Sequence, residues 1–95
     1  MCVRSLARLA QYERQRNNHA EAVSFYEKAV GLDPVDESLW YQLIETHGQA
    51  GQMEAAARCY RRYAETVRDQ LGEEPSAALN DLYNRLRSTL AGLRR

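Results

Sequence analysis

Histidine and cysteine are the residues of this chain best suited to catalysis or metal binding, but their spacing favours neither. His19 and His47 are far apart in the sequence, and Cys2 and Cys59 form no CxxC pair. A tetrahedral metal site needs four ligands brought together, and a nucleophile needs a base within hydrogen-bond reach. The surrounding apolar pattern places Cys59 in the core. We therefore expect no enzyme activity, no metal ion and no cofactor.

The composition predicts helices throughout. Ala, Leu, Arg, Glu and Gln dominate a chain that is 44% hydrophobic and 27% charged, and these residue types favour helices over strands. Asn, Gly and Pro residues divide the chain into five helical stretches. They cover about 3–16, 19–30, 36 to the Gly48–Gly51 segment, 53–71 and 76–93.

Charge and hydropathy limit the classes of partner. Thirteen basic residues balance thirteen acidic ones, so a strong phosphate-binding surface is not expected. No apolar stretch approaches the roughly 20 residues that span a bilayer, and no signal peptide is evident. Two cysteines are too few for a disulfide scaffold. The sequence predicts a cytoplasmic protein that binds no membrane and no nucleic acid by itself.

An internal repeat of 34 residues is the most informative pattern. It follows the tetratricopeptide spacing, in which helical hairpins stack side by side. The pairs of equivalent residues are Leu6 and Trp40, Leu9 and Leu43, Ala10 and Ile44, Ala22 and Ala56, and Tyr26 and Tyr60. We predict an all-α, tetratricopeptide-like right-handed stack within one domain (1–95). It comprises one hairpin at about 3–31, a second at about 36–71 and a C-terminal helix at about 76–93.

The repeat also predicts how the hairpins pack. Ala22 and Ala56 mark the closest approach of the two helices of each hairpin, where a larger side chain would push them apart. The large apolar side chains fill the space beside that contact, and two tyrosines seal the seam toward the next hairpin. These residues are Leu9, Trp40, Leu43, Tyr26 and Tyr60. Tyr63 stands where the first hairpin has Ala29, which predicts looser packing in the second hairpin.

The segment after the second hairpin points to a family. It reads Leu71-Gly72-Glu73-Glu74-Pro75-Ser76, followed by Leu82-Tyr83, and Leu32-Asp33-Pro34 occurs earlier. Together these residues resemble the bacterial transcriptional activator domain of SARP- and AfsR-type regulators, over about 6–86. Glu73 and Ala77 depart from the valine and proline common in that family.

The resemblance implies a role in transcription without catalysis. In that family the module usually follows an OmpR-type winged helix that binds DNA, and further helices precede the portion seen here. Neither is present in this chain. The resemblance therefore implies a fragment of a transcription factor that contributes assembly or effector coupling, while another domain reads DNA.

A partner surface is expected on the concave face, which tetratricopeptide units form from the first helix of each hairpin. The residues predicted to line it are Arg4, Gln11, Arg14, Tyr41, Glu45 and Gln49. Chaperone-tail binders of this fold grip a terminal carboxylate with Lys, Arg and Asn, and the matching positions here hold Ala7, Gln11 and Gln42. Tyr41 can anchor a partner because an exposed tyrosine offers contact area at little entropic cost.

Two further surfaces allow alternative interpretations. Arg58, Arg61, Arg62 and Arg68 form either a contact for DNA phosphates or an acidic partner, or a solvated helix face. The heptad-like leucines of the last helix pack either within the chain or against a second copy. For the second case we predict a weak to moderate homodimer. Its contact would be formed by Leu86, Leu90 and Leu93.

The functional prediction is a non-catalytic interaction or oligomerisation module of a bacterial transcriptional regulator. It would couple assembly or effector state to a DNA-binding domain outside this chain. Its partner would be another protein or a second copy. The alternative is a stand-alone tetratricopeptide adaptor that binds a peptide or protein outside transcription.

Overall fold

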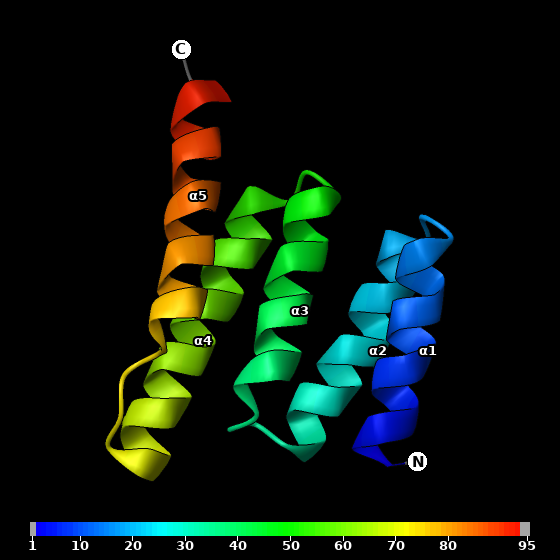
Figure 1. Cartoon of the computed structure of the whole chain (residues 1–95), viewed down its shortest axis with the longest axis horizontal. Helices are drawn as coiled ribbons and strands as arrows, with labels where there is room; N and C mark the ends of the chain where they lie inside the picture. Colours follow the sequence, from blue (N-terminus) through cyan, green and yellow to red (C-terminus); the bar gives the residue numbers. More distant parts are fainter. Residues whose placement is uncertain (1, 94–95) are drawn as a thin grey trace.

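Five helices account for almost all of residues 2–93 (Figure 1). The computed structural model describes the backbone of residues 2–93 and the side chains of residues 2–88. No strand occurs within residues 2–93, which confirms the all-α prediction. The helices are α1 (Val3–Gln15), α2 (His19–Leu32), α3 (Glu37–Gln49), α4 (Met53–Leu71) and α5 (Ala77–Leu93). α2 continues through Gly31, where the sequence predicted its end.

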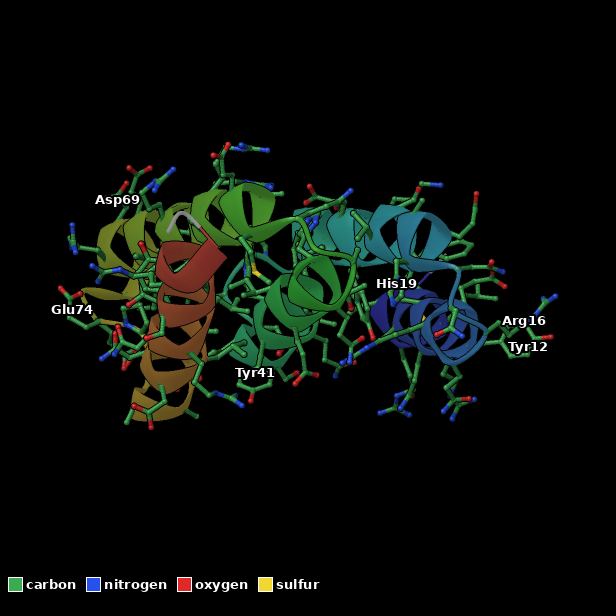
Figure 2. All side chains as sticks on the ribbon, turned by 90° about the horizontal axis from the view of Figure 1, so that it is seen from above. Tyr12, Arg16, His19, Tyr41, Asp69 and Glu74 are labelled. Atoms are coloured by element: carbon green, nitrogen blue, oxygen red, sulfur yellow. The ribbon has the colours of Figure 1, made fainter. Side chains whose placement is uncertain are left out.

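The helices pack as two hairpins, α1–α2 and α3–α4, with α5 against the second (Figure 1). α2 contacts α3, and α5 contacts both α3 and α4. Seen from above, α1, α3 and α5 lie along one side and α2 and α4 along the other (Figure 2). The molecule measures 43 × 37 × 17 Å, so it is a slab only two helices thick. The α1–α2 hairpin therefore has a helical neighbour on one side only among residues 2–93.

The same turn closes both hairpins. Asn17 and Gly51, 34 residues apart, have φ angles of 64° and 76°, in the left-handed region that Gly and Asn tolerate best. The next residue's amide then donates to a carbonyl five residues earlier. Asn18 N lies 2.8 Å from Glu13 O, and Gln52 N lies 2.8 Å from His47 O. The repeat thus extends to the backbone geometry that reverses the chain.

The core confirms most of the repeat pairs. Ala22 and Ala56 are completely buried, as the close helix crossings require. Leu6 and Trp40 are buried as a pair, and so are Ala10 and Ile44. Tyr26 is also fully buried, and its hydroxyl donates to Gln42 Oε1 on α3 at 2.6 Å. Tyr26 therefore joins the two hairpins, as the sequence predicted.

Leu9 contradicts the prediction that both leucines of its pair fill the core. Leu9 is 37% exposed, whereas Leu43 is 0% exposed. The two occupy equivalent positions in their own hairpins, but α3 also packs against α2, whose Tyr26 bonds to Gln42, the residue before Leu43. No described helix packs on the corresponding side of α1. The exposure of these two leucines therefore depends on whether a neighbouring helix covers them and not on their position in the repeat.

Aromatic residues pack the second hairpin. The rings of Trp40 and Tyr63 lie 5.9 Å apart between centroids, and Trp40 Nε1 donates to Pro34 O at 2.8 Å. α1 and α2 stay in close backbone contact over more of their length than α3 and α4 do. That difference agrees with the looser second hairpin predicted from Tyr63 in place of Ala29.

α5 is held against the second hairpin at its start and near its middle. Tyr60 is half-buried and stacks on Tyr83 with ring centroids 4.1 Å apart. Near the helix start, the Glu37 carboxylate accepts hydrogen bonds from the backbone amide and hydroxyl of Ser76. Packing of the last two helices within one chain is therefore confirmed for these residues.

Candidate functional site

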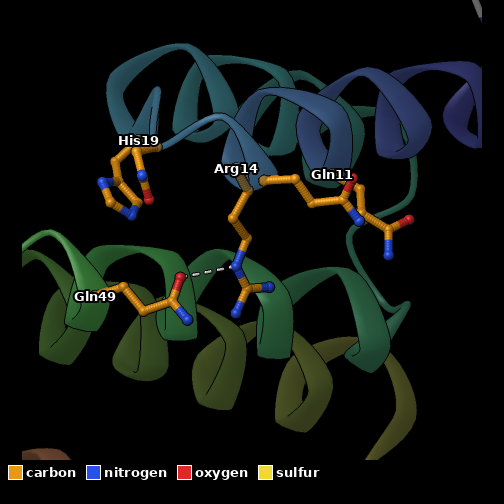
Figure 3. A pocket seen from close by; sticks show the side chains of 6 residues that line it. Gln11, Arg14, His19 and Gln49 are labelled. Atoms are coloured by element: carbon orange, nitrogen blue, oxygen red, sulfur yellow. Dashed lines mark hydrogen bonds between the residues drawn. The ribbon is translucent and has the colours of Figure 1, made fainter.

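The predicted partner face is centred on a link between the two hairpins. Arg14, on α1, donates through Nη2 to Glu45 Oε1. Its Nε donates to Gln49 Oε1 at 2.9 Å, as Figure 3 shows. Glu45 and Gln49 are one turn apart on α3, so one guanidinium can reach both. The structure thus brings together three of the six residues predicted for this face.

Burial strengthens the Arg14–Glu45 pair. Both side chains are shielded, with 18% and 34% of their surface exposed. Burial alone lowers the pKa of Arg14, but the hydrogen bond and charge of Glu45 outweigh it and the net shift is upward. Charge-assisted hydrogen bonds of this kind are stronger than neutral ones. Arg14 therefore remains charged and fixed in place.

An open hollow lies beside this link. It has a volume of about 500 Å³ and is polar. Its walls are formed by Gln11, Arg14, Gln15, Asn17, His19 and Gln49 (Figure 3). Amide, guanidinium and imidazole groups converge there, so the hollow can exchange hydrogen bonds with a polar segment of a partner. Sequence reasoning considered His19 only for catalysis and metal binding. The hairpin turn places His19 in this hollow. The sequence signal for that turn was the 34-residue spacing between Asn17 and Gly51.

Tyr41 and Arg4 extend the face unequally. Tyr41, one turn before Glu45, is half-buried, and Figure 2 shows its side chain on the side formed by α1, α3 and α5. Arg4 is exposed and lies two helical turns, about 10 Å, before Gln11 on α1. It does not line the hollow. The face therefore comprises the hollow and link from Gln11 to Glu45, with Tyr41 one turn further along α3 and Arg4 at a distance.

Of the predicted self-association residues, the structure describes the side chain of Leu86. Leu86 is half-buried, and its Cδ2 lies 2.7 Å from where a Cβ on Gly48 would be. The Leu86 side chain therefore packs closely against α3 at Gly48. Leu90 and Leu93 lie outside the residues whose side chains the structure describes. A second hollow, of about 410 Å³, is lined by Leu86, Leu82, Met53 and Glu45 among others.

The arginine cluster of α4 is partly neutralised within the chain. Arg62 Nη1 lies 3.1 Å from both carboxylate oxygens of Glu27, and Arg68 makes two hydrogen bonds to Glu74. The Arg62 guanidinium also lies 4.9 Å from the Trp40 ring centroid. Cations already paired with carboxylates are less available for phosphate. This arrangement favours the interpretation of a structural, solvated face.

The cysteine and histidine of the second hairpin are structural residues. Burial, reinforced by the charge of Glu27, raises the pKa of the Cys59 thiol, the opposite of what an activated nucleophile needs. His47 is buried, and its Nδ1 lies 2.9 Å from Gln52 Oε1. In the part of the chain that the structure describes, no three His, Cys, Asp or Glu residues are grouped to hold a metal ion.

None of the described helices combines the length and hydropathy needed to span a bilayer.

Comparison with known proteins identifies a family. The model of the bacterial transcriptional activator domain matches residues 1–87. Two curated relatives, both named transcriptional regulatory protein MoaR1, come from Mycobacterium bovis and Mycobacterium tuberculosis, and each is 33% identical over 60 residues. The match covers 63% of this chain and 19% of each relative, so it spans about a fifth of their length. No solved structure shows a significant match.

Proposed function

We propose, on the premise that this chain belongs to the bacterial transcriptional activator domain family, that it is a non-catalytic protein-interaction module of a bacterial transcriptional regulator. It acts in the cytoplasm and couples the state of a partner to a DNA-binding domain outside this chain. The partner binds the strip formed by Gln11, Arg14, Gln49, Glu45 and Tyr41.

The observation that carries this proposal is the position of the Arg14 link. The polar contact between α1 and α3 is made by Arg14, Glu45 and Gln49, three residues of the proposed face. A partner that hydrogen-bonds to Glu45 or Gln49 competes with Arg14 for the same oxygens. Binding would therefore change the relation between the hairpins, which supplies the differential contact that coupling requires.

Tyr41 gives this face an anchor separate from the link. Tyr41 is partly buried against the core. The hydrogen bonds of the link join Arg14 to Glu45 and Gln49 and do not involve Tyr41. Aromatic side chains of this kind contribute a large share of the binding energy at protein interfaces. Replacing Tyr41 tests partner binding and leaves the connection between the hairpins in place.

The test replaces residues of the native gene in its host and measures transcript abundance across the genome. Tyr41→Ala is expected to change the regulated transcripts, Tyr41→Phe to change them less, and Arg61→Ala, an exposed substitution on α4, to leave them unchanged. Thermal unfolding of the purified variants checks that folding is retained. Unchanged transcripts in a folded Tyr41→Ala strain would refute the proposed face.

Self-association through Leu86, Leu90 and Leu93 is the second form of this proposal. Its support is the apolar spacing of α5, with Leu86 half-buried at the edge of the second hollow. Light scattering is expected to show a concentration-dependent dimer that Leu90→Glu dissociates. A monomer at the highest attainable concentration would eliminate this form and leave a different protein as the partner.

A further inference from the structure

The strip proposed to bind a partner is bordered by two hollows that lie next to each other. The first hollow, beside Arg14, lies between α1 and α3, and the second lies between α3 and α5. Gln49 belongs to the lining of both hollows, so its side chain forms the boundary between them. Figure 1 shows the two hairpin turns beside these hollows at the same end of the molecule. Each hollow therefore has described helices on both sides.

Side-chain carboxamides dominate the first hollow. Four of its lining residues carry one, and all four are exposed: Gln11, Gln15, Asn17 and Gln49. A carboxamide offers donors and an acceptor side by side, which is the complement of a peptide group. Gln11 and Gln15 are one turn apart on α1, so both can reach the same segment of a partner. The first hollow is therefore suited to the backbone of a partner chain.

A partner helix makes poor use of these carboxamides. The backbone N–H and C=O groups of a helix are already bonded to each other, whereas those of an extended segment remain available. A helix in a groove also needs a continuous apolar stripe to lie on. Here the hydrogen bond between Arg14 and Gln49 stands at the boundary of the two hollows. The first hollow therefore favours an extended segment.

Charge adds a preference for an acidic residue. The described residues that line the first hollow include the Arg14 guanidinium and no carboxylate. Figure 3 shows Arg14 and Gln49 meeting in this hollow. A backbone N–H that donates to Gln49 Oε1 takes the place of Arg14 Nε. The released guanidinium can then donate a charge-assisted hydrogen bond to a carboxylate of the same segment.

The second hollow is suited to a bulky apolar residue. Its volume is about 410 Å³, and Met53, Leu82 and Leu86 form the apolar part of its lining. The two hollows are separated by α3, which is about 10 Å across with its side chains. An extended chain advances about 3.3 Å per residue. The apolar residue therefore stands about three positions from the acidic one.

The described part of a second copy does not provide such a segment. Its longest stretch between helices, residues 72–76, contains no large apolar residue. That stretch is also held on its own chain, because Arg68 donates to Glu74 and Ser76 donates to Glu37. The occupant is therefore sought in a different protein.

We propose that the two hollows together bind one extended segment of a partner protein, in which an acidic and a bulky apolar residue stand about three positions apart. The acidic residue meets Arg14, and the backbone bonds to the carboxamides of α1 and to Gln49. The apolar residue enters the hollow beside Leu86. This inference rests on the proposed function, since it specifies the partner of the same strip.

The probe is a phage-displayed library of random linear peptides about 12 residues long, which exceeds the span of both hollows. The library is panned on the 95-residue chain. Enriched peptides are synthesised and titrated into the isotope-labelled chain, and amide shifts are followed by NMR. We expect them to share the acidic and apolar pair and to bind with a Kd below about 100 µM. Amide shifts should appear both at residues 15–19 and at residues 48–53.

Changes to the peptide and to the chain test the binding mode. An ester in place of one peptide amide between the two key residues removes a donor and should weaken binding about fivefold. A helical staple across the same residues should abolish binding. In the chain, Gln11→Ala combined with Gln15→Ala preserves helix propensity and should weaken binding about tenfold. Gln70→Ala removes an exposed carboxamide on α4 and should leave binding unchanged.

The proposal is wrong if no peptide binds with a Kd below about 100 µM, if the amide shifts are confined to one hollow, or if the ester and the glutamine substitutions have no effect. It is also wrong if the stapled peptide binds as tightly as the linear one, which would assign the strip to a helix. The proposed function is judged separately, by the transcripts of the Tyr41→Ala strain. Changed transcripts without peptide binding would retain the partner face and eliminate the extended segment.

Discussion

The two hairpins carry the same repeat, yet they differ in how much of it is buried. The second hairpin lies between α2 and α5, so Leu43 and Thr46 are fully enclosed. The first has a neighbour on one side only among the described residues, and Leu9 and Tyr12 remain exposed. A repeat therefore specifies which side of a helix is apolar. Whether that side is buried depends on the next element that packs against it.

The largest expected effect comes from truncating the two equivalent leucines. Leu43→Ala removes a fully buried side chain and should lower the free energy of unfolding by about 2–5 kcal/mol, whereas Leu9→Ala should cost less than about 1 kcal/mol. Urea unfolding followed by circular dichroism measures both. Similar losses for the two variants would mean that the hairpins are buried alike.

The link between the hairpins comes next. Arg14→Ala leaves the partly buried Glu45 carboxylate without its cation and should lower the free energy of unfolding by about 1–3 kcal/mol. Arg4→Ala, an exposed substitution on the same helix, should change it by less than about 0.5 kcal/mol. Thermal unfolding compares the two. If Arg14→Ala left the free energy of unfolding unchanged, the contacts of α2 would be sufficient to hold the hairpins together.

The equivalent turns allow a finer comparison. Gly51→Ala places a Cβ in the left-handed region and should cost about 1 kcal/mol, while Asn17→Gly should alter stability by less than about 0.5 kcal/mol. Chemical denaturation at fixed pH measures both changes. If Gly51→Ala were neutral, the two turns could not share the backbone geometry described above.

The smallest effect is confined to alkaline pH. Burial, together with the Glu37 carboxylate, raises the pKa of Tyr63 from 10.0 to about 12. The unfolded chain releases this proton first, so the contribution of Tyr63 to stability is complete below pH 10 and is lost as the pH rises toward 12. Ala29, its counterpart in the first hairpin, has no titratable group.

Tyr63→Phe isolates that effect. The variant should lose stability less steeply than the parent chain between pH 10 and 12. Urea midpoints measured across this range test the difference. Burial also raises the pKa values of Tyr26 and Tyr60, so some alkaline loss should persist in the variant. Identical pH profiles would contradict the assigned role of Tyr63.

The sequence was sufficient to predict the helices and the positions of the helix crossings. Ala22 and Ala56 depend only on packing inside one hairpin, and a 34-residue spacing reveals that directly. Burial of Leu9 could not be predicted, because it depends on a neighbour that the repeat does not specify. The same spacing did predict that Tyr26 seals the seam between hairpins.

The candidate site was less predictable than the fold. Helical periodicity placed Arg14, Glu45 and Gln49 on one face, but the bonds among them depend on the angle between α1 and α3. The pairing of Arg62 with Glu27 likewise joins residues 35 positions apart on different helices. Such contacts follow from inter-helix geometry, which a single sequence does not encode in any short motif.

The Ser76–Glu37 contact affects how α5 can move relative to the second hairpin. Because the first turn of α3 supports the start of α5, the last helix cannot swing freely about the Glu73–Pro75 linker. We expect α5 to move as an arm together with the second hairpin, to which the Tyr60–Tyr83 stack also holds it. A small rotation of that hairpin would be magnified along the length of the arm, so anything joined beyond it would be displaced further than the hairpin itself.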